Sequence, residues 1–366
     1  MAVVLLYILS HLLSFLSILS FPHFAMTAPV DPRQSQPPNN TVGDGADGGV
    51  PASAIQQSTS ELPVYVRDYA PLVWLSGSER YMPSDIASQV ANTIPKINGA
   101  PVAQAPSPLT LNNLDQLNAQ GGKDIWLTSR EGIPAYPKWF EGVTPDGNRK
   151  TNGATTAAIV TVDKGNGNLD AFYFYFFAFN RGNTVLGQEF GSHVGDWEHN
   201  MIRFQNGVPQ AVYFSQHASS QSFTYKAVEK NGIRPVAYIS EGSHAVYATT
   251  GTHDHTIPRL NLPGGLVEDH CDRGKLWDPV LSTYSYRYDR VSQKFSPYDP
   301  GFPVNWLYFL GRWGDDAPPK GSEGQFEIFG QKRYVGGPTG PMDKRLDREN
   351  MSGVKNDNWV RPFLTP

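Results

Sequence analysis

Residues 191–199, GSHVGDWEH, carry the densest group of side chains that could do chemistry. In an extended strand Asp196 and Glu198 point to the same face, with their Cα atoms about 7 Å apart. His193 lies three residues before Asp196, across a glycine-containing bend that could bring its ring to the same point. One imidazole and two carboxylates can bind a divalent cation, and oxygen-rich ligation favours Ca²⁺, Mg²⁺ or Mn²⁺ over Zn²⁺. His193, Asp196 and Glu198 are therefore predicted metal ligands.

A purely structural role for the same two carboxylates is the alternative. Clusters of perturbed carboxylates are often ion pairs, and Arg181, His199 and Arg203 are candidate partners. Under that interpretation Asp196 and Glu198 hold neighbouring segments together and bind no metal.

Further histidines stand at or just beyond the ends of expected strands, where loop residues often carry function. The candidates of this kind are His217, His244, His253 and His255. The last two could chelate a metal through their H-x-H spacing. A lone histidine is more often a structural residue with satisfied hydrogen bonds, so each of the four keeps that alternative.

The usual catalytic motifs are missing from the sequence: it contains no G-x-S-x-G, no P-loop, no Rossmann glycine run and no H-E-x-x-H. Ser243 and His244 are neighbours in the sequence. Neighbouring side chains in a strand face opposite ways, which makes these two a poor nucleophile–base pair. The sequence therefore leaves open whether the protein is an enzyme.

The composition limits the class of protein. Of 366 residues, 30 are Lys or Arg and 34 are Asp or Glu, for a net charge of -4. This balance excludes a general electrostatic surface for nucleic acid, which needs a clustered positive excess. The 35 glycines and 30 prolines favour many turns and short elements over long helices. A single cysteine, Cys271, excludes an intrachain disulfide and a four-cysteine zinc site.

Strands must position these side chains. Runs rich in β-branched and aromatic residues predict strands at residues 157–162, 169–179, 197–204, 211–215 and 235–240. The run 169–179, LDAFYFYFFAF, is apolar at nearly every position and predicts a strand buried on both faces. Residues 64–66 predict a further short strand, and Ser84 or Asp85 the N-cap of a short helix. The predicted fold class is mainly β: a single β-sandwich-like domain over residues 62–366, with long loops and a few short helices.

The N-terminal segment differs from the rest of the chain. Residues 1–30 contain no Asp, Glu, Lys or Arg, and residues 2–21 are mostly apolar and long enough to span a bilayer as a helix. We interpret residues 1–28 as a signal peptide or an uncleaved signal-anchor, with membrane contact through residues 1–24. Residues 29–61, rich in Pro, Gly, Ser, Asn and Gln, predict a disordered linker.

Two N-x-[ST] sequences make Asn39 and Asn350 candidate glycosylation sites. Asn39 would stand in the exposed linker, which fits entry into the secretory pathway. We therefore expect a protein of the secretory pathway, secreted or vacuolar, and held in a membrane if the N-terminal segment stays uncleaved.

Several longer motifs occur in order along the chain. They are YAPLVWL at 69–75, ERYMPSD at 79–85, HVGDWEH at 193–199, FSQH at 214–217, YISEGSHA at 238–245 and WDP at 277–279. Together they resemble the fungal Vps62 family, named for vacuolar protein sorting-associated protein 62. The resemblance covers about residues 62–300 and implies a link to protein sorting to the vacuole.

A more distant likeness connects residues 193–198 with the necrosis-inducing toxin-like proteins, whose heptad G-H-R-H-D-W-E binds a divalent metal at the base of a β-sandwich. Aligned on Asp-Trp-Glu, the heptad's first histidine, its aspartate and its glutamate fall on the three predicted ligands, while its second histidine falls on Gly195. The upstream acidic ligand of those proteins has only Asn180 or Asn183 as a counterpart here. An amide is a weaker ligand than a carboxylate.

Two classes of function follow from these observations. The first is a Vps62-like sorting protein that binds a divalent metal, and the second is a secreted metal-dependent hydrolase or a glycan- or membrane-binding effector. A catalyst needs an open ligand position on the metal and a pocket beside it, whereas a sorting module needs an exposed binding surface. The sequence does not specify partner, cargo or substrate.

Overall fold

The computed structural model describes residues 61–364, apart from residues 186, 217–218, 255–266, 329 and 353–358. The elements described below belong to one compact unit, Gln56–Pro366. The predicted signal peptide or anchor, most of the predicted linker and Asn39 lie outside the described residues, as do His217 and His255. Among the described residues, no helix is long and apolar enough to cross a membrane.

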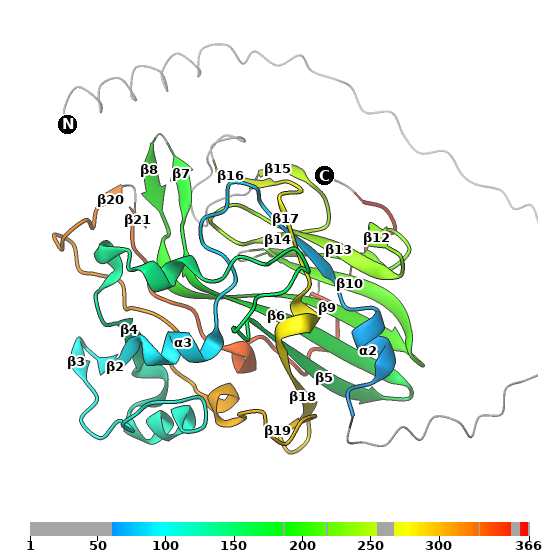
Figure 1. The fold of residues 1–366 in the computed structure, drawn as a ribbon, viewed down its shortest axis with the longest axis horizontal. Coiled ribbons are helices and arrows are strands. Elements are labelled where there is room, and N and C mark those ends of the chain that lie inside the picture. Colours follow the sequence, from blue (N-terminus) through cyan, green and yellow to red (C-terminus); the bar gives the residue numbers. More distant parts are fainter. Residues whose placement is uncertain are drawn as a thin grey trace, which may run out of the picture. The chain divides into compact units, whose positions relative to one another are not determined.

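A seven-stranded sheet forms the centre of the fold (Figure 1), in the order β11-β10-β9-β6-β5-β18-β19. Neighbouring strands are antiparallel except for the parallel pair β5 and β18. The strands are β5 (Ala157–Gly165), β6 (Asn168–Asn180), β9 (His193–Gln205), β10 (Val208–Gln216), β11 (Ser219–Thr224), β18 (Thr283–Asp289) and β19 (Lys294–Pro297). The register of the long pair β6 and β9 sets Asn180 opposite His193 at one end of the sheet.

A second, smaller sheet covers one face of the central sheet. Its strands, in the order β12-β13-β1-β17 with β14 beside β13, are β1 (Leu72–Leu75), β12 (Lys230–Asn231), β13 (Arg234–Ile239), β14 (Val246–Tyr247) and β17 (Lys275–Trp277). Val73 and Ile239 from this sheet share a buried core with Tyr175, Phe177 and Phe214 of the central sheet. Two sheets packed over a common core make a sandwich, as predicted.

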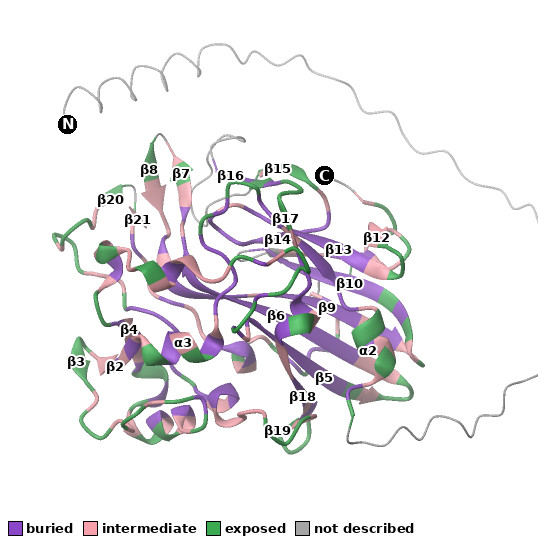
Figure 2. Ribbon diagram, in the orientation of Figure 1, coloured by how far each residue is buried: buried purple, intermediate pink, exposed green. Residues whose placement is uncertain are grey.

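Short elements and loops cover the opposite face of the central sheet. They include α3 (Ile86–Ala91) and a small sheet of β2 (Thr93–Ile97), β3 (Ala100–Pro101) and β4 (Trp126–Ser129). Leu117, Trp306 and Trp313 from this layer pack on Phe174 and Trp197. Because both faces are covered, β6 is buried from Asp170 to Asn180, which confirms the prediction from its apolar sequence (Figure 2).

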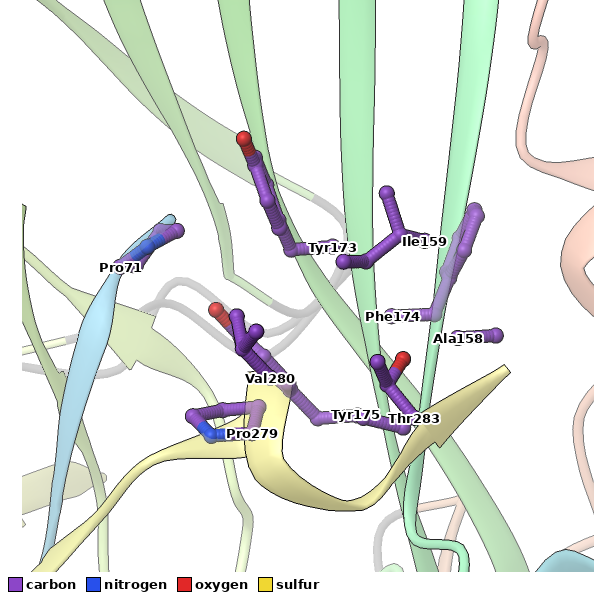
Figure 3. A pocket seen from close by; sticks show the side chains of 10 residues that line it. Pro71, Ala158, Ile159, Tyr173, Phe174, Tyr175, Pro279, Val280 and Thr283 are labelled. Carbon is purple, nitrogen blue, oxygen red and sulfur yellow. The ribbon is translucent and has the colours of Figure 1, made fainter. Parts of the chain in front are cut away.

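The remaining elements are short. One is the α-helix α2 (Val64–Asp68). The 3₁₀ helices, labelled η, are η1 (Leu114–Gln120), η2 (Gly122–Asp124), η3 (Ile133–Ala135), η4 (Lys138–Glu141), η5 (Pro279–Ser282), η6 (Asn305–Tyr308) and η7 (Pro341–Asp343). The short strands are β7 (Asn183–Val185), β8 (Gln188–Phe190), β15 (Gly251–Asp254), β16 (Glu268–Cys271), β20 (Glu327–Ile328) and β21 (Gln331–Lys332). Where η5 lies on the central sheet, Figure 3 shows Val280 close to Ile159 and Tyr173. The gap there measures about 10 Å³, room for about one water, so the sandwich is tightly closed at this point.

The mainly β fold class is confirmed, and so is the short helix α3, whose N-cap is Asp85 with its side chain accepting from Ser88 N–H at 2.7 Å. The predicted strand at residues 64–66 is wrong, because this segment belongs to the helix α2. Tyr65 and Tyr69 both pack on the ring of Phe204. Side chains four residues apart lie close together on a helical turn, so the contacts of Tyr65 and Tyr69 with Phe204 favour the helix over the β propensity of the segment.

Candidate functional site

A buried group of two carboxylates and one imidazole, here called the acid–imidazole cluster, consists of Glu79, Asp196 and His244. The His244 ring is fully buried and stacks on Phe177 of β6 at 3.8 Å between ring centroids. Its Nδ1 lies 3.0 Å from Asp196 Oδ2. Its Nε2 lies 3.1 Å from the carbonyl oxygen of Tyr81 and 3.7 Å from Glu79 Oε2. Three segments far apart in the sequence therefore meet around one ring.

A tight turn between β13 and β14 presents His244 to the carboxylates. The Ser240 N–H donates to the Ala245 carbonyl at 3.0 Å and closes the turn. Gly242 and His244 both have positive φ, +75° and +56°. A histidine in the left-handed region is uncommon, and such strained positions persist only where the surroundings hold them. The Gly242 N–H donates to Glu79 Oε2 at 2.5 Å, and this hydrogen bond helps to stabilise the turn.

The His244 ring is surrounded by acceptors, so both of its nitrogens carry hydrogen in this arrangement. Burial opposes protonation, but the hydrogen bonds to Asp196 and Glu79 outweigh it and raise the pKa of His244 to about 9. Burial also favours the neutral form of the carboxyls. The hydrogen bonds and charge of His244 nevertheless hold the pKa of Glu79 and of Asp196 below the usual values. At neutral pH the cluster contains one cation between two anions.

His193 stands beside this cluster in a different protonation state. Burial lowers its pKa below the usual value, more than the nearby Asp196 raises it. Its Nδ1 lies 2.7 Å from the carbonyl oxygen of Gly195, an acceptor, so Nδ1 carries the proton and Nε2 keeps its lone pair. Gly195 has a φ of +71°, and a Cβ there would lie 2.0 Å from the Trp313 carbonyl oxygen, so only glycine fits this bend.

The three predicted metal ligands are brought together only in part. Asp196 and His193 interact electrostatically, but Glu198 accepts a hydrogen bond from the Ser215 hydroxyl on the neighbouring strand β10. Within the described part of the chain, no three His, Cys, Asp or Glu side chains gather closely enough to hold a metal ion. Because His217 lies outside that part, metal binding stays a prediction.

The two asparagines proposed as counterparts of an acidic ligand act here as hydrogen-bond donors. The Asn180 amide donates to Asp196 Oδ2 at 3.0 Å and to the Ser243 carbonyl at 2.7 Å. The Asn183 amide donates to Asp269 Oδ1 at 3.1 Å. Both therefore extend the acid–imidazole cluster into a wider buried network of polar groups.

His253 and Asn350 are the remaining candidates from the sequence in the described part of the chain. His253 stacks on Tyr247 at 3.8 Å, and its Nε2 hydrogen-bonds to the Thr249 carbonyl at 3.1 Å. Asn350 is partly buried, and its glycosylation stays a prediction. On the β15–β16 ladder His253 stands opposite the buried Asp269, whose charge acts on it electrostatically.

Asp196 pairs with His244, which is not among the partners expected under the ion-pair alternative. The three expected partners bind elsewhere: Arg203 to Asp170 at 2.7 Å, Arg181 to Glu241 at 2.5 Å and His199 to Arg348 at 3.0 Å. The buried carboxylate of Asp196 thus takes its cation from a turn that follows it by almost fifty residues.

Sequence reasoning missed two acidic members of the network. Glu79 stands in the ERYMPSD motif, which was a signal of family and not of a site. Asp269 has no local signal, yet it is 1% exposed and accepts from the hydroxyls of Ser243 at 2.6 Å and Tyr247 at 2.7 Å. A buried carboxylate can be recognised only when its donors are known, and these come from other segments.

Comparison with known proteins shows which protein family this chain is similar to. Residues 179–319 match the family model of Vps62, vacuolar protein sorting-associated protein 62. The Saccharomyces cerevisiae protein named putative vacuolar protein sorting-associated protein TDA6 is 37% identical over 331 residues, which cover 82% of this chain and 70% of that protein. Vacuolar protein sorting-associated protein 62 of the same yeast is 31% identical over 319 residues, covering 79% and 67%.

Two solved structures have a partial likeness to this chain. NLPPya in complex with mannosamine is 11% identical, with a TM-score of 0.26, and the likeness covers 51% of this chain and 66% of that one. Necrosis and Ethylene inducing Protein 2 from the causal agent of cocoa's Witches Broom disease is 13% identical, with a TM-score of 0.26 and coverages of 52% and 69%.

Proposed function

The chain belongs to the family of vacuolar protein sorting-associated protein 62, and from this premise we propose that it serves protein sorting to the vacuole as a binding module rather than as an enzyme. The observation that carries the proposal is 37% identity, over 82% of the chain, to a relative named for vacuolar protein sorting. The protein would accordingly work in the secretory or vacuolar pathway.

The geometry of the acid–imidazole cluster supports binding over catalysis. A catalytic base or nucleophile must present a reactive atom to the substrate. Here both nitrogens of His244 point at acceptors, and Asp196 Oδ2 receives hydrogen bonds from His244 and Asn180. The acid–imidazole cluster therefore fixes the turn around Gly242 against the ends of β6 and β9. The loops above it would form the surface that meets the partner.

The test is retention of a soluble vacuolar hydrolase in the protein's native cell. Removing the protein is expected to divert part of the hydrolase to the medium, measured as activity outside and inside the cells. A copy carrying His253→Phe should restore retention. A copy carrying His244→Phe, expressed to the same level, should restore less retention because the acid–imidazole cluster has lost its cation. Full retention in cells that lack the protein would contradict the sorting role.

Divalent-metal binding at His193 and Asp196 is a second candidate function, favoured by the state of His193. Metal-bound histidines usually donate their second ring N–H to a carbonyl or carboxylate, and His193 Nδ1 already faces the Gly195 carbonyl. Its Nε2 and the negatively charged Asp196 would be two ligands for the ion. A metal with an open position would supply Lewis acidity, and that would restore support for the hydrolase alternative.

Titration of the metal-free protein with Mn²⁺, followed by electron paramagnetic resonance, tests this candidate. We expect His193→Gln to weaken Mn²⁺ binding at least tenfold. The matched control is His270→Gln, because His270 is an exposed histidine of β16 outside the cluster. Equal binding by both variants and the unaltered protein would place any bound metal elsewhere.

A further inference from the structure

A concave feature of the molecule that shares no residue with the acid–imidazole cluster lies between the small sheet of β2 and β4 and the loop at residues 315–319. Its volume is about 300 Å³, at the lower end of the range for small-molecule sites. The lining residues that matter here are Lys96, Asn98, Trp126, Thr128, Asp315 and Asp316. The size suits one small molecule, and the lining mixes an aromatic ring with both signs of charge.

The wall formed by the sheet is closely packed around Trp126. The β2–β4 register sets Lys96 opposite Trp126, which places both side chains on the same face. The Arg312 guanidinium lies 5.6 Å from the Trp126 ring centroid. A Cβ at Gly336 would come within 2.7 Å of the same ring, so the backbone of Gly336 holds it closely. Trp126 is only partly buried and therefore offers a preformed aromatic surface to the cavity.

The charged groups of the cavity face one another without pairing. Asp315 is 6% exposed, and its carboxylate accepts from the Ser129 N–H at 2.6 Å and from the Ile133 N–H. Lys96 acts on Asp315 electrostatically, but neither forms an ion pair within the described part of the chain. Burial raises the pKa of Asp315 to about 6. This buried carboxylate has two backbone donors and the charge of Lys96 nearby but no ion-pair partner in the described part of the chain, and its position in the cavity lining allows a ligand to supply one.

We propose that this cavity binds a small zwitterion of the α-amino acid type. Its carboxylate would meet Lys96, its ammonium group would meet Asp315 and Asp316, and an apolar side chain would lie against Trp126. A pure anion or a pure cation would face a wall of its own sign, and a neutral sugar would leave both charged walls unpaired. The proposal rests on the cavity alone and does not depend on the sorting role.

Isothermal titration calorimetry of the full chain with L-phenylalanine tests the proposal. We expect saturable binding of one molecule per chain. N-acetyl-L-phenylalanine lacks the ammonium group and L-phenylalaninamide lacks the carboxylate, so each should bind at least tenfold more weakly. Absence of binding, equal binding of all three compounds, or tighter binding of glucose would overturn the proposal.

Variants of the two accessible charged residues assign the ends of the ligand. Lys96→Met should weaken L-phenylalanine about tenfold and leave L-phenylalaninamide unchanged, since the amide has no carboxylate to lose. Asp316→Asn should weaken L-phenylalanine and leave N-acetyl-L-phenylalanine unchanged. Lys294→Met, an exposed lysine of β19 outside the cavity, is the matched control and should change nothing. If Lys96→Met behaves like the Lys294→Met control, the assignment is wrong.

Discussion

His244 and His199 are both buried histidines that pack on phenylalanines of β6, yet their surroundings impose opposite charge states. His244 lies on the face shared with the second sheet, between two carboxylates, and its pKa is raised to about 9. His199 lies on the other face, where its Nε2 accepts from the Arg348 guanidinium at 3.0 Å. Burial, with the charges of Arg348 and Lys344, holds the pKa of His199 well below the usual value. The charge of a buried histidine is thus decided by its partners and not by burial alone.

Arg348 is a buried cation that contacts aromatic rings and carbonyl oxygens, while the carboxylate of Asp170 acts on it electrostatically. Its guanidinium lies 4.8 Å from the ring centroid of Phe172 and 4.7 Å from that of Tyr213. It also donates to the carbonyls of Lys344 at 3.1 Å and Met351 at 3.2 Å. Aromatic faces and carbonyl dipoles supply part of the stabilisation that the two carboxylates supply to His244. This arrangement attaches the segment of residues 344–351, here called the C-terminal segment, to the central sheet.

The largest effect should come from removing the cation of the acid–imidazole cluster. His244→Phe keeps a ring that can stack on Phe177 but leaves Glu79 and Asp196 facing each other without a counter-ion. Breaking a buried pair by removing one partner costs about 3–5 kcal/mol. Urea denaturation at pH 6 should show a loss of that size in the free energy of unfolding.

The control for this change is His253→Phe, because His253 also stacks on a ring, that of Tyr247, and its Nε2 hydrogen-bonds to the backbone carbonyl of Thr249. It should cost no more than about 1 kcal/mol. Equal losses for the two variants would mean that stacking, and not charge, makes His244 important.

The next effect concerns Arg348 and its contacts with the rings of Phe172 and Tyr213. Arg348→Met fills part of the same slot but loses the cation–π contacts and the bonds to backbone carbonyls, and we expect a loss of about 2–3 kcal/mol in the free energy of unfolding. Thermal and urea unfolding measure it, with the exposed Arg290→Met as control. A loss below that of the control would show that the C-terminal segment is not fastened at Arg348.

The pH dependence of stability should separate the two histidines. For His244, whose pKa is raised, the stabilisation is complete below the unfolded value of 6.5 and is lost as pH rises through about 9. The contributions of Glu79 and Asp196, whose pKa values are lowered, are complete above the unfolded values of 4.5 and 3.8. The gap between the unaltered protein and His244→Phe should therefore be widest between pH 4.5 and 6.5. A gap that widens above pH 9 would contradict an imidazolium at this position.

The smallest effect is expected at His199. Since its pKa is lowered in the folded state, it must stay neutral, and its contribution is lost as pH falls below the unfolded value of 6.5. His199→Phe should cost about 1 kcal/mol at pH 8, because Arg348 loses one acceptor. Below pH 6.5 the variant should lose stability less steeply than the unaltered protein. If the free energies of unfolding of the two proteins fell equally steeply below pH 6.5, His199 would not be taking up a proton on unfolding.

Local patterns predicted much of the fold. The aromatic run of β6 indicated a strand covered on both faces, and the position of Asp85 before a short apolar segment indicated the N-cap of α3. The helix α2 escaped prediction because Tyr65 and Tyr69 are held by Phe204, a residue of β9 that is distant in sequence. Propensity acts over a few neighbours, whereas that helix depends on a surface made elsewhere.

The order of the motifs determined the family, and the alternation of side chains determined that β9 carries its acidic residues toward one face, because both are properties of adjacent residues. Only the tertiary structure decided that Asp196 pairs with His244 while Glu198 binds Ser215. Electrostatic and hydrogen-bond energies depend on distances in space. Those distances arise when the turn after β13 and the segment at Glu79 close over the end of the central sheet.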